Sequence, residues 1–500
     1  MDFSPKLILK DYNNKDLNKA SAIEHLISLI ENAHDINTIV ESIKILGTIK
    51  AENNHVFHLL ENLLISDSHE KIRYISAKIL YQNFLDRIFE PMKFAFYHEK
   101  SISCLLIIVD ALGKINNHSS KSLLMDKIKR IGNEKYKRNL DLLFKTKKIE
   151  DIPGDSLAEI VKNYIVFNAL EQKFNRIDFK LNHGLLIKLD LSNVSSHISR
   201  SNILKSLPNY LGELSHLKKL DLKINRLSTL PESISSLSSL EFIDLSYNKI
   251  KYLPNSIGSL RSLKSLYLRY NDLKSIPNSI SSLNNLRILD LRVNKLTNLN
   301  DSISHLSSLE ILDLHGNQLD ILPKSLSKLT SLKQLNLGLN NLSIFPNWMK
   351  SYNFLEVLGL GGNKSLNKIP DWINYLHSLK HLELFDNNIN ELPEALGDLS
   401  SLEVLNLRNN HIQSLPESMG SLSNLKHLNL SWNKFTTLPE WIGSLSSLEV
   451  LNLWGNNIEI LPDSISSLKS LKNLNLSFNK IKEIPDSLKK LENVGLVVKI

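Results

Sequence analysis

From Leu217 onward, leucines and other apolar residues recur at a fixed spacing through the rest of the chain. The pattern L-x-x-L-x-L-x-x-N-x-L-x-x-L-P-x-x-I-x-x-L-x-x is repeated twelve times. In each copy, Leu-x-Leu predicts a short strand with both leucines on one face, and Ile-x-x-Leu-x-x-Leu predicts a short helical return. One copy cannot bury its leucines alone, so the copies must stack. The pattern predicts an α/β solenoid whose parallel strands line its concave face.

An asparagine ends the predicted strand of every copy. Successive asparagines are 23 residues apart, except for one step of 24 between Asn363 and Asn387. The amide carries two N–H donors and an acceptor, so we expect it to bond backbone groups of its own turn and of the adjoining copy. The positions are Asn225, Asn248, Asn271, Asn294, Asn317, Asn340, Asn363, Asn387, Asn410, Asn433, Asn456 and Asn479.

The chain from 1 to 131 repeats in a different way. Apolar helical segments follow one another there at a nearly constant step, with a second helix predicted between each pair. Paired helices with such a period indicate an all-α solenoid, and SDSHEKIRYISAKIL (66–80) resembles the start of a HEAT-type repeat. The first set lies at 22–32, 56–66, 88–98 and 121–131, and the second at 41–49, 74–82 and 107–115.

A connecting region lies between the two kinds of repeat. Residues 155–173 show helical spacing after a capping box formed by Ser156 and Glu159, and we expect this helix to cover the first leucine layer. Residues 186–216 indicate an irregular first copy, with Asn202, Leu204, Leu207 and Pro208 in phase but His197 and Ser199 in place of strand leucines. The predicted domains are 1–150, 151–216 and 217–500.

The consensus sequence of these leucine copies resembles one branch of the leucine-rich repeat proteins. LPESISSLSSLEFIDLSYN (230–248) is similar to the intracellular Ras-binding leucine-rich scaffolds and to the leucine-rich parts of plant resistance proteins. The resemblance covers more than half of the chain. It implies a concave face that binds other proteins, commonly small GTPases or phosphatases, and no catalytic site.

Positions between the leucines vary, and we expect them to face away from the core. The position between the two strand leucines holds Asp221, Asp244, Tyr267, Asp290, Asp313, Asn336, Gly359, Glu383, Asn406, Asn429, Asn452 and Asn475. Two residues further on, the chain has Lys223, Ser246, Arg269, Arg292, His315, Gly338, Gly361, Phe385, Arg408, Ser431, Trp454 and Ser477.

These rows give three zones of candidate binding residues. The last copies form a C-terminal aromatic zone, and aromatic residues with arginine dominate binding energy at protein interfaces. Its members are Phe385, Arg408, Trp432, Trp454 and Phe478. The middle has glycines in place of side chains, at Gly338, Gly359, Gly361 and Gly362. The N-terminal zone sets a basic row beside a carboxylate row, and its candidates are Tyr247, Tyr267, Arg269, Tyr270, Arg292 and His315.

Each zone also has a purely structural interpretation. The acidic and basic rows can pair with each other across strands and keep the surface soluble. The glycines can accommodate the irregular copy, and the aromatic residues can fill gaps between neighbouring strands. The leading hypothesis is a non-enzymatic scaffold that binds a folded protein, a Ras-like GTPase by resemblance, while the helical repeats bind a second partner.

A basic stretch offers a second hypothesis. Residues 114–148 hold eleven Lys/Arg against three Asp/Glu, which equals the net charge of +8 of the whole chain. Such a stretch can attract nucleic acid or anionic lipid. Leu123, Leu124, Ile128 and Ile131 lie on one helical side, however, and a solvated helical face explains the lysines without a ligand. Few aromatic residues interleave with the charges, so nucleic acid is the less favoured partner.

Little in the sequence indicates chemistry or export. Phosphate-loop, dinucleotide-binding and zinc-protease patterns do not occur, so we expect no catalytic, cofactor or metal site. Cys104 is the one cysteine, and it lies in an apolar segment. A single thiol favours a reducing cytoplasmic location. We see no secretory signal and no apolar run long enough to span a membrane. VGLVVKI (494–500) starts a thirteenth copy without an evident cap, which predicts an open edge strand able to pair with another chain.

Overall fold

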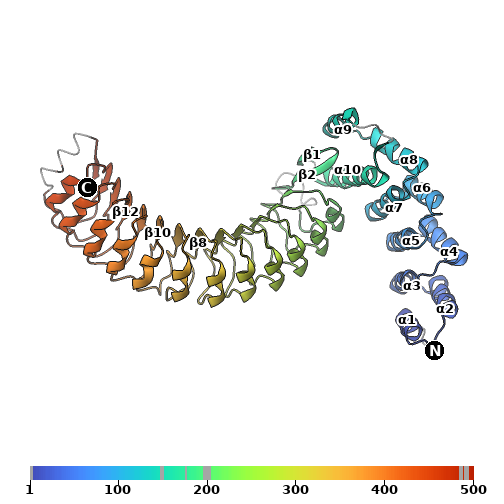
Figure 1. Ribbon diagram of the computed structural model, residues 1–500, viewed down its shortest axis with the longest axis horizontal. Helices are drawn as coiled ribbons and strands as arrows, with labels where there is room; N and C mark the ends of the chain where they lie inside the picture. The colour runs from blue at the N-terminus through green and yellow to red at the C-terminus, as the bar shows by residue number, and fades with distance from the viewer. Residues whose placement is uncertain (1–3, 147–150, 175–176, 195–203, 484–487, 489–494) are drawn as a thin grey trace. The chain divides into compact units, whose positions relative to one another are not determined.

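The computed structural model describes residues 4–146, 151–174, 177–194, 204–483, 488 and 495–500. Its backbone forms two compact units (Figure 1). The helical unit consists of Met1–Leu189 with Tyr210–Leu217, and the repeat unit consists of Asp190–Asn209 with Lys218–Ile500. The predicted fold class, an α/β solenoid with a parallel sheet after an all-helical region, is confirmed.

The helical unit contains ten helices in its described residues. They are α1 (Pro5–Asn13), α2 (Lys19–Asn32), α3 (Ile36–Thr48), α4 (Asn54–Ser66), α5 (Glu70–Asn83), α6 (Phe89–His98), α7 (Ile102–Ile115), α8 (His118–Lys129), α9 (Glu134–Thr146) and α10 (Gly154–Phe174). The seven helices predicted up to Ile131 are thus confirmed. Helices α3, α5, α7 and α10 pack side by side in one layer, and α4, α6 and α8 pack in the other. Leu46, Leu60, Leu80 and Leu112 are fully buried between the layers.

Helix α10 confirms the predicted helix but not its predicted start. The helix begins at Gly154, so Ser156 lies inside the first turn and cannot form the capping box. The Asn116 side chain at the end of α7 supplies the cap, because its Oδ1 accepts the Gly154 N–H at 2.7 Å. Glu159 accepts instead from the Ser215 hydroxyl at 3.0 Å. After α10, β1 (Asp178–Asn182) and β2 (Leu185–Asp190) are joined by a tight turn with positive φ at His183 and Gly184.

Helix α7 contains the single cysteine. Cys104 is fully buried, and its thiol donates to the Glu70 carbonyl oxygen at 3.2 Å. Burial raises the pKa of this thiol to about 12. Its thiolate is therefore scarce at neutral pH, as expected of a thiol in an apolar segment. Within the described residues, no helix is both long and apolar enough to cross a membrane.

The repeat unit is a stack of parallel strands of three residues each. They are β3 (Lys219–Asp221), β4 (Phe242–Asp244), β5 (Ser265–Tyr267), β6 (Ile288–Asp290), β7 (Ile311–Asp313), β8 (Gln334–Asn336), β9 (Val357–Gly359), β10 (His381–Glu383), β11 (Val404–Asn406), β12 (His427–Asn429), β13 (Val450–Asn452), β14 (Asn473–Asn475) and β15 (Val497–Lys499). Each pairs with the next in sequence order, and equivalent residues are in register, as in Leu405 with Leu428.

Short 3-10 helices form the other side of the copies, and all but one residue of the first belongs to the segment Tyr210–Leu217 of the helical unit. They are η3 (Asn209–Glu213), η4 (Glu232–Ser236), η5 (Asn255–Ser259), η6 (Asn278–Ser282), η7 (Asp301–His305), η8 (Lys324–Lys328), η9 (Asn347–Ser351), η10 (Asp371–Tyr375), η11 (Glu394–Asp398), η12 (Glu417–Ser421), η13 (Glu440–Ser444) and η14 (Asp463–Ser467). Most follow the Leu-Pro step, as predicted. The strands line the inner edge of the curved repeat unit and the 3-10 helices line its outer edge (Figure 1).

The leucines and asparagines between these two edges hold the copies together. The strand leucines are fully buried, and each contributes about 1.5–3 kcal/mol of burial free energy. Asn248 donates to the carbonyls of Leu222 and Leu245, both at 3.0 Å, and its Oδ1 accepts the Leu227 N–H at 3.0 Å. The same bonds recur from copy to copy, so the expected role of the asparagines is confirmed.

Two irregular places were marked by the sequence. The extra residue of the longer copy is absorbed directly after Asn363, whose N–H donates to Asn387 Oδ1 at 2.8 Å while β9 and β10 stay in register. In the irregular first copy, Leu204 and Leu207 are buried. The predicted positions His197, Ser199 and Asn202 lie outside the described residues.

Candidate protein-binding face

The inner face is the set of side chains on β3–β14 and the following turns that point away from the leucine core. Its first row consists of the residues between the two strand leucines. The acids and amides of this row hydrogen-bond to the backbone, which the sequence pattern did not predict. The side-chain Oδ1 of these residues accepts the N–H two residues further on, at 2.9–3.2 Å. Such a bond closes the turn after the strand. It is made by Asp221, Asp244, Asp290, Asp313, Asn336, Asn406, Asn429, Asn452 and Asn475.

Ion pairs connect the two rows in the N-terminal zone. Arg292 contacts Asp290 at 2.7 Å and Asp313 at 3.3 Å, and Lys223 contacts Asp221 at 3.1 Å. The hydrogen bond to Asp290 raises the pKa of Arg292, whereas burial raises the pKa of Asp313. The acidic and basic rows therefore pair with each other. Of these contacts, the one between Arg292 and Asp313 joins neighbouring strands, as the structural interpretation expected, and the other two lie within one copy. Arg292 is the most fully engaged of the candidate residues in this zone.

Tyrosines and Arg269 form the other part of the N-terminal zone. The rings of Tyr247 and Tyr270 stack with centroids 4.4 Å apart, and both side chains are more than two-fifths exposed. The Arg269 guanidinium lies 5.5 Å from the Tyr247 ring, and Tyr267 packs against Phe242 at 5.4 Å. The structure thus brings Tyr247, Tyr270 and Arg269 together on the turns after β4 and β5, while Tyr267 lies within β5 against Phe242.

The glycines of the middle zone make room for neighbouring side chains. A Cβ on Gly361 would lie 2.5 Å from the Phe385 ring, and a Cβ on Gly338 would lie 2.7 Å from His315 Nδ1. The inner face is therefore not bare here, because Phe385 and His315 lie against the glycine backbone. Phe385 consequently packs toward the middle of the face.

The C-terminal aromatic zone contains a continuous cluster of three rings. The Trp432 and Trp454 centroids are 5.0 Å apart, and those of Trp454 and Phe478 are 5.8 Å apart, both in edge-to-face geometry. Trp432 is 46% exposed and Phe478 is 79% exposed. Arg408, on the turn after β11, is also exposed. We call Trp432, Trp454 and Phe478 the aromatic cluster.

Two members of the aromatic cluster occupy a special backbone position. The residue before each repeated asparagine has positive φ in all twelve copies, for example 53° at Trp432 and 56° at Phe478. The Trp432 N–H donates to the Trp454 carbonyl at 2.8 Å, so stacking on the next copy fixes this conformation. A left-handed residue other than glycine costs about 1–2 kcal/mol. Trp432 and Trp454 lie on the turns after the strands, because β12 and β13 end at Asn429 and Asn452.

Comparison with known proteins identifies the repeated segments as leucine-rich repeats. The model for the leucine-rich repeat region matches residues 167–286 and 340–456, the leucine rich repeat model matches 261–319, and a two-copy repeat model matches 446–493. The solved structure of a leucine-rich repeat protein from Leptospira interrogans is 36% identical over 60% of this chain and 82% of its own, with a TM-score of 0.53. This chain belongs to the leucine-rich repeat proteins.

Two further structures extend the comparison. A plant peptide hormone receptor in complex with RGF2 is 27% identical, covers 59% of this leucine-rich repeat protein and 53% of its own chain, and has a TM-score of 0.51. An internalin of Listeria monocytogenes covers 75% and 96% of the two chains with a TM-score of 0.55, and at 20% identity it shows the fold alone. Among curated proteins, no relative was found.

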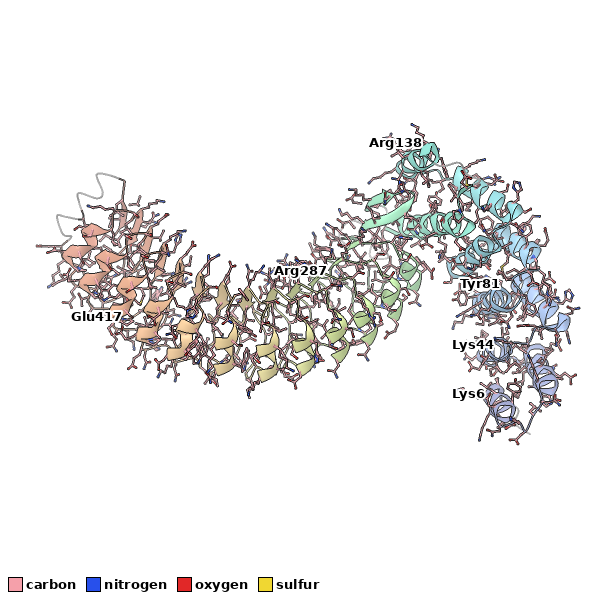
Figure 2. All side chains as sticks on the ribbon, viewed as in Figure 1. Lys6, Lys44, Tyr81, Arg138, Arg287 and Glu417 are labelled. Carbon is pink, nitrogen blue, oxygen red and sulfur yellow. The ribbon has the colours of Figure 1, made fainter. Side chains whose placement is uncertain are left out.

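The basic stretch of this leucine-rich repeat protein forms α8 and α9 of the helical unit. Ile128 and Ile131 are buried, as the helical spacing predicted. Lys135 contacts Asp178 at 3.6 Å and lies 4.2 Å from the Phe179 ring, so part of the charge is used within the unit. Arg138 on α9 is exposed (Figure 2). Residues 147–148 lie outside the described part.

A buried lysine surrounded by carboxylates is the main charged cluster of the helical unit. Lys162 on α10 is 8% exposed, and its Nζ lies 2.7 Å from Asp110, 3.1 Å from Glu159 and 3.5 Å from Glu213. Burial alone would lower the pKa of Lys162, but the carboxylates raise it instead. Burial raises the pKa values of Asp110 and Glu213. Across the described part of the chain, no three His, Cys, Asp or Glu side chains are placed to hold a metal ion.

Proposed function

We propose that this leucine-rich repeat protein is a non-enzymatic scaffold that binds a folded protein on its inner face. The observation that carries the proposal is the aromatic cluster. Trp432 and Phe478 remain exposed in a strained backbone conformation, although burial would reward such large rings. Exposed aromatic rings beside an arginine are the usual centre of a protein interface, and Arg408 is exposed on the turn after β11, within the same zone.

The proposed partner is a Ras-like small GTPase in a signalling pathway inside the cell. The repeat sequence at residues 230–248 supports this choice, since it resembles the repeats of the Ras-binding scaffolds. The single cysteine supports a reducing cytoplasmic location. The relative that is a peptide hormone receptor supports a polypeptide ligand. In the N-terminal zone, the stacked tyrosines with Arg269 are proposed as a second contact area for the same partner, together with Tyr267 and His315.

The helical unit is proposed to be a HEAT-like domain that binds another protein. Its paired helices recur at a nearly constant step, which supports this assignment. Exposed Phe94 and Tyr97 on α6, at 46% and 58%, supply apolar surface for contact. With this assignment, we propose domains at 1–150 and 217–500, joined by the connecting region 151–216.

The scaffold hypothesis is tested by partner capture from a native cell extract. We expect the unmodified chain to retain a protein that Trp432→Ala, Trp454→Ala and Arg408→Ala lose, with at least about tenfold less partner for each tryptophan. Tyr375→Ala is the matched control, because this aromatic side chain is 55% exposed on the outer side, at η10.

Equal capture by the tryptophan variants and the control would refute the proposed face. Purified Ras-like GTPases, loaded with GTP and titrated against the full chain, test the partner class separately. If none of them binds, the GTPase assignment fails while the scaffold hypothesis stands or falls on the capture experiment.

Self-association through β15 is a further proposal for the repeat unit. β15 is the last strand of the described sheet, and Val497 within it and Ile500 directly after it are 51% and 72% exposed. An exposed apolar edge strand pairs readily with another chain. We expect analytical ultracentrifugation to show a dimer that Val497→Lys disperses. Sedimentation as a monomer at every concentration would remove the proposal.

A further inference from the structure

The first row of the inner face changes from acids to amides along the chain. Asp221, Asp244, Asp290 and Asp313 occupy it in the early copies, and Asn406, Asn429, Asn452 and Asn475 occupy it in four consecutive late copies. Both residue types make the same backbone bond through Oδ1, at 2.9–3.1 Å for the acids and 3.1–3.2 Å for these amides. The turn therefore needs only the oxygen. The amide nitrogen of the late copies has no role in closing the turn.

The amide nitrogens of the late copies are available to a ligand. Because Oδ1 is held against the backbone, Nδ2 of each side chain is turned away from the turn. Nδ2 of Asn406 donates to Glu383 Oε2 at 2.7 Å. For Asn429, Asn452 and Asn475, the described residues supply no acceptor to Nδ2, and the three side chains are half-buried. Each such nitrogen has two N–H groups to donate.

An apolar hollow lies beside these donors. Its volume is about 390 Å³, and it extends over β10–β13, with Val404, His427 and Val450 in its lining. Asn406, Asn429 and Asn452 form its polar margin. Trp454 follows Asn452 by two residues, so the aromatic cluster continues the same surface. The one carboxylate at the hollow is Glu383, which already accepts from Asn406 and whose pKa is raised by burial.

We infer that the amide row binds the main-chain carbonyl oxygens of a polypeptide segment that lies across β11–β14, with one apolar side chain in the hollow. This inference rests on the proposed scaffold function and names the chemistry that its inner face recognises. Neutral donors match neutral acceptors, and Arg408 is the one lysine or arginine among the inner positions of β11–β14 and their turns. Main-chain carbonyls are neutral acceptors, and a polypeptide also carries the apolar side chain that the hollow requires.

A carbohydrate fits the same surface less well. Each sugar hydroxyl is a donor as well as an acceptor, so a bound sugar needs acceptors from the protein. The polar groups at the inner positions of β11–β14 and their turns are amides, His427, Arg408, Ser431, Ser477 and the indole N–H groups of Trp432 and Trp454. The oxygens of Asn406, Asn429, Asn452 and Asn475 already accept backbone N–H groups. The Ser431 hydroxyl itself donates to Asn429 Oδ1 at 2.7 Å. Donors therefore outnumber free acceptors on this surface.

The chain offers an unusually well-matched test. Asn429→Asp and Asn452→Asp keep the oxygen that closes the turn but replace the outward N–H₂ with a carboxylate oxygen. Aspartate already occupies this position in four early copies, so both variants are expected to fold, which circular dichroism and thermal unfolding verify. Asp244→Asn makes the reverse change in the N-terminal zone and serves as the control.

The probe is a phage-displayed library of short random peptides, selected on the full chain, followed by affinity measurement of the selected peptides. We expect peptides with an apolar side chain, whose Kd rises at least about tenfold on Asn429→Asp or Asn452→Asp, because a donor is lost and two acceptors are opposed. Asp244→Asn is expected to change Kd less than about twofold. Selection of no peptide, or equal affinity for all three variants, would overturn the inference.

Two further outcomes separate this inference from the scaffold proposal. If Trp432→Ala abolishes peptide binding while Asn429→Asp does not, the aromatic face binds protein without the amide row, and the inference alone fails. If an oligosaccharide array binds the unmodified chain and Asn429→Asp removes that binding while no peptide is selected, the ligand is a carbohydrate, and the inference also fails.

Discussion

Replacing Asn340 with alanine is expected to lower the free energy of unfolding of the repeat unit by about 3–5 kcal/mol. The Asn340 amide donates to the carbonyls of Leu314 and Leu337, both at 3.0 Å, and accepts the Leu319 N–H at 3.0 Å. Alanine would leave these backbone groups buried without partners. Denaturant unfolding followed by circular dichroism measures the loss, and hydrogen exchange at Leu319 locates it.

Asn341→Ala is the control for this substitution. Asn341 is the next residue, and its side chain is exposed. A surface substitution of this kind changes stability by less than about 0.5 kcal/mol. If the two variants unfold at the same denaturant concentration, and the Leu319 amide exchanges equally slowly in both, the asparagine row does not hold the copies together.

The second large effect is expected in the helical unit. Lys162→Met removes the cation that contacts Asp110, Glu159 and Glu213. The three neighbouring carboxylates then lose this counterion. Removing one member of a buried ionic group typically costs about 3–5 kcal/mol. Chemical unfolding of the full chain, monitored by a probe in the helical unit, is expected to show this loss at about pH 7.5.

The loss caused by Lys162→Met is expected to shrink in acid. A carboxyl group whose folded-state pKa is raised destabilises the fold when it is ionised, and this cost disappears as the pH falls through the raised pKa. Burial already raises the pKa values of Asp110 and Glu213, and the loss of Lys162 raises them further. The variant should therefore recover between about pH 7.5 and the ordinary glutamate pKa of 4.5.

Lys44→Met provides the comparison for Lys162→Met. Lys44 lies exposed on α3 (Figure 2), and its pair with Glu41 at 3.6 Å is a surface contact. Its replacement is expected to change stability by less than about 1 kcal/mol at either pH. A deficit for Lys162→Met that is equally large at both pH values would contradict the role assigned to the carboxylates.

The interactions that could be predicted from the sequence are those that repeat with its period. Asn248 bonds the copy before it in the same way that Asn271 bonds its own predecessor, so one chemical argument about an amide holds for every copy. The burial of the leucines could be predicted for the same reason, because equivalent leucines recur in every copy. The cluster around Lys162 could not be predicted, because Asp110, Glu159 and Glu213 come from segments that no period relates.

Within the candidate face, the rows were predicted more accurately than the shape of the turns. The sequence places Trp432 near the strand, but the left-handed backbone before Asn433 depends on hydrogen bonds to the next copy, which residue types do not reveal. The contact of Phe385 with Gly361 was missed for a related reason. It joins two copies at the place where the one longer step changes the turn. The capping box at Ser156 failed because Asn116, from α7, caps the helix two residues earlier.

At the left-handed residue before each asparagine, the backbone conformation does not depend on which side chain is present. Ile224, Asp386, Asn409 and Trp432 all adopt this conformation with φ between 53° and 57°, although their side chains range from aliphatic through acid and amide to aromatic. The backbone bonds to the next copy fix the geometry there, whichever side chain the residue carries. Substitutions at these positions can therefore change the binding surface without changing the fold. We expect close homologues that bind different ligands to differ most at these positions.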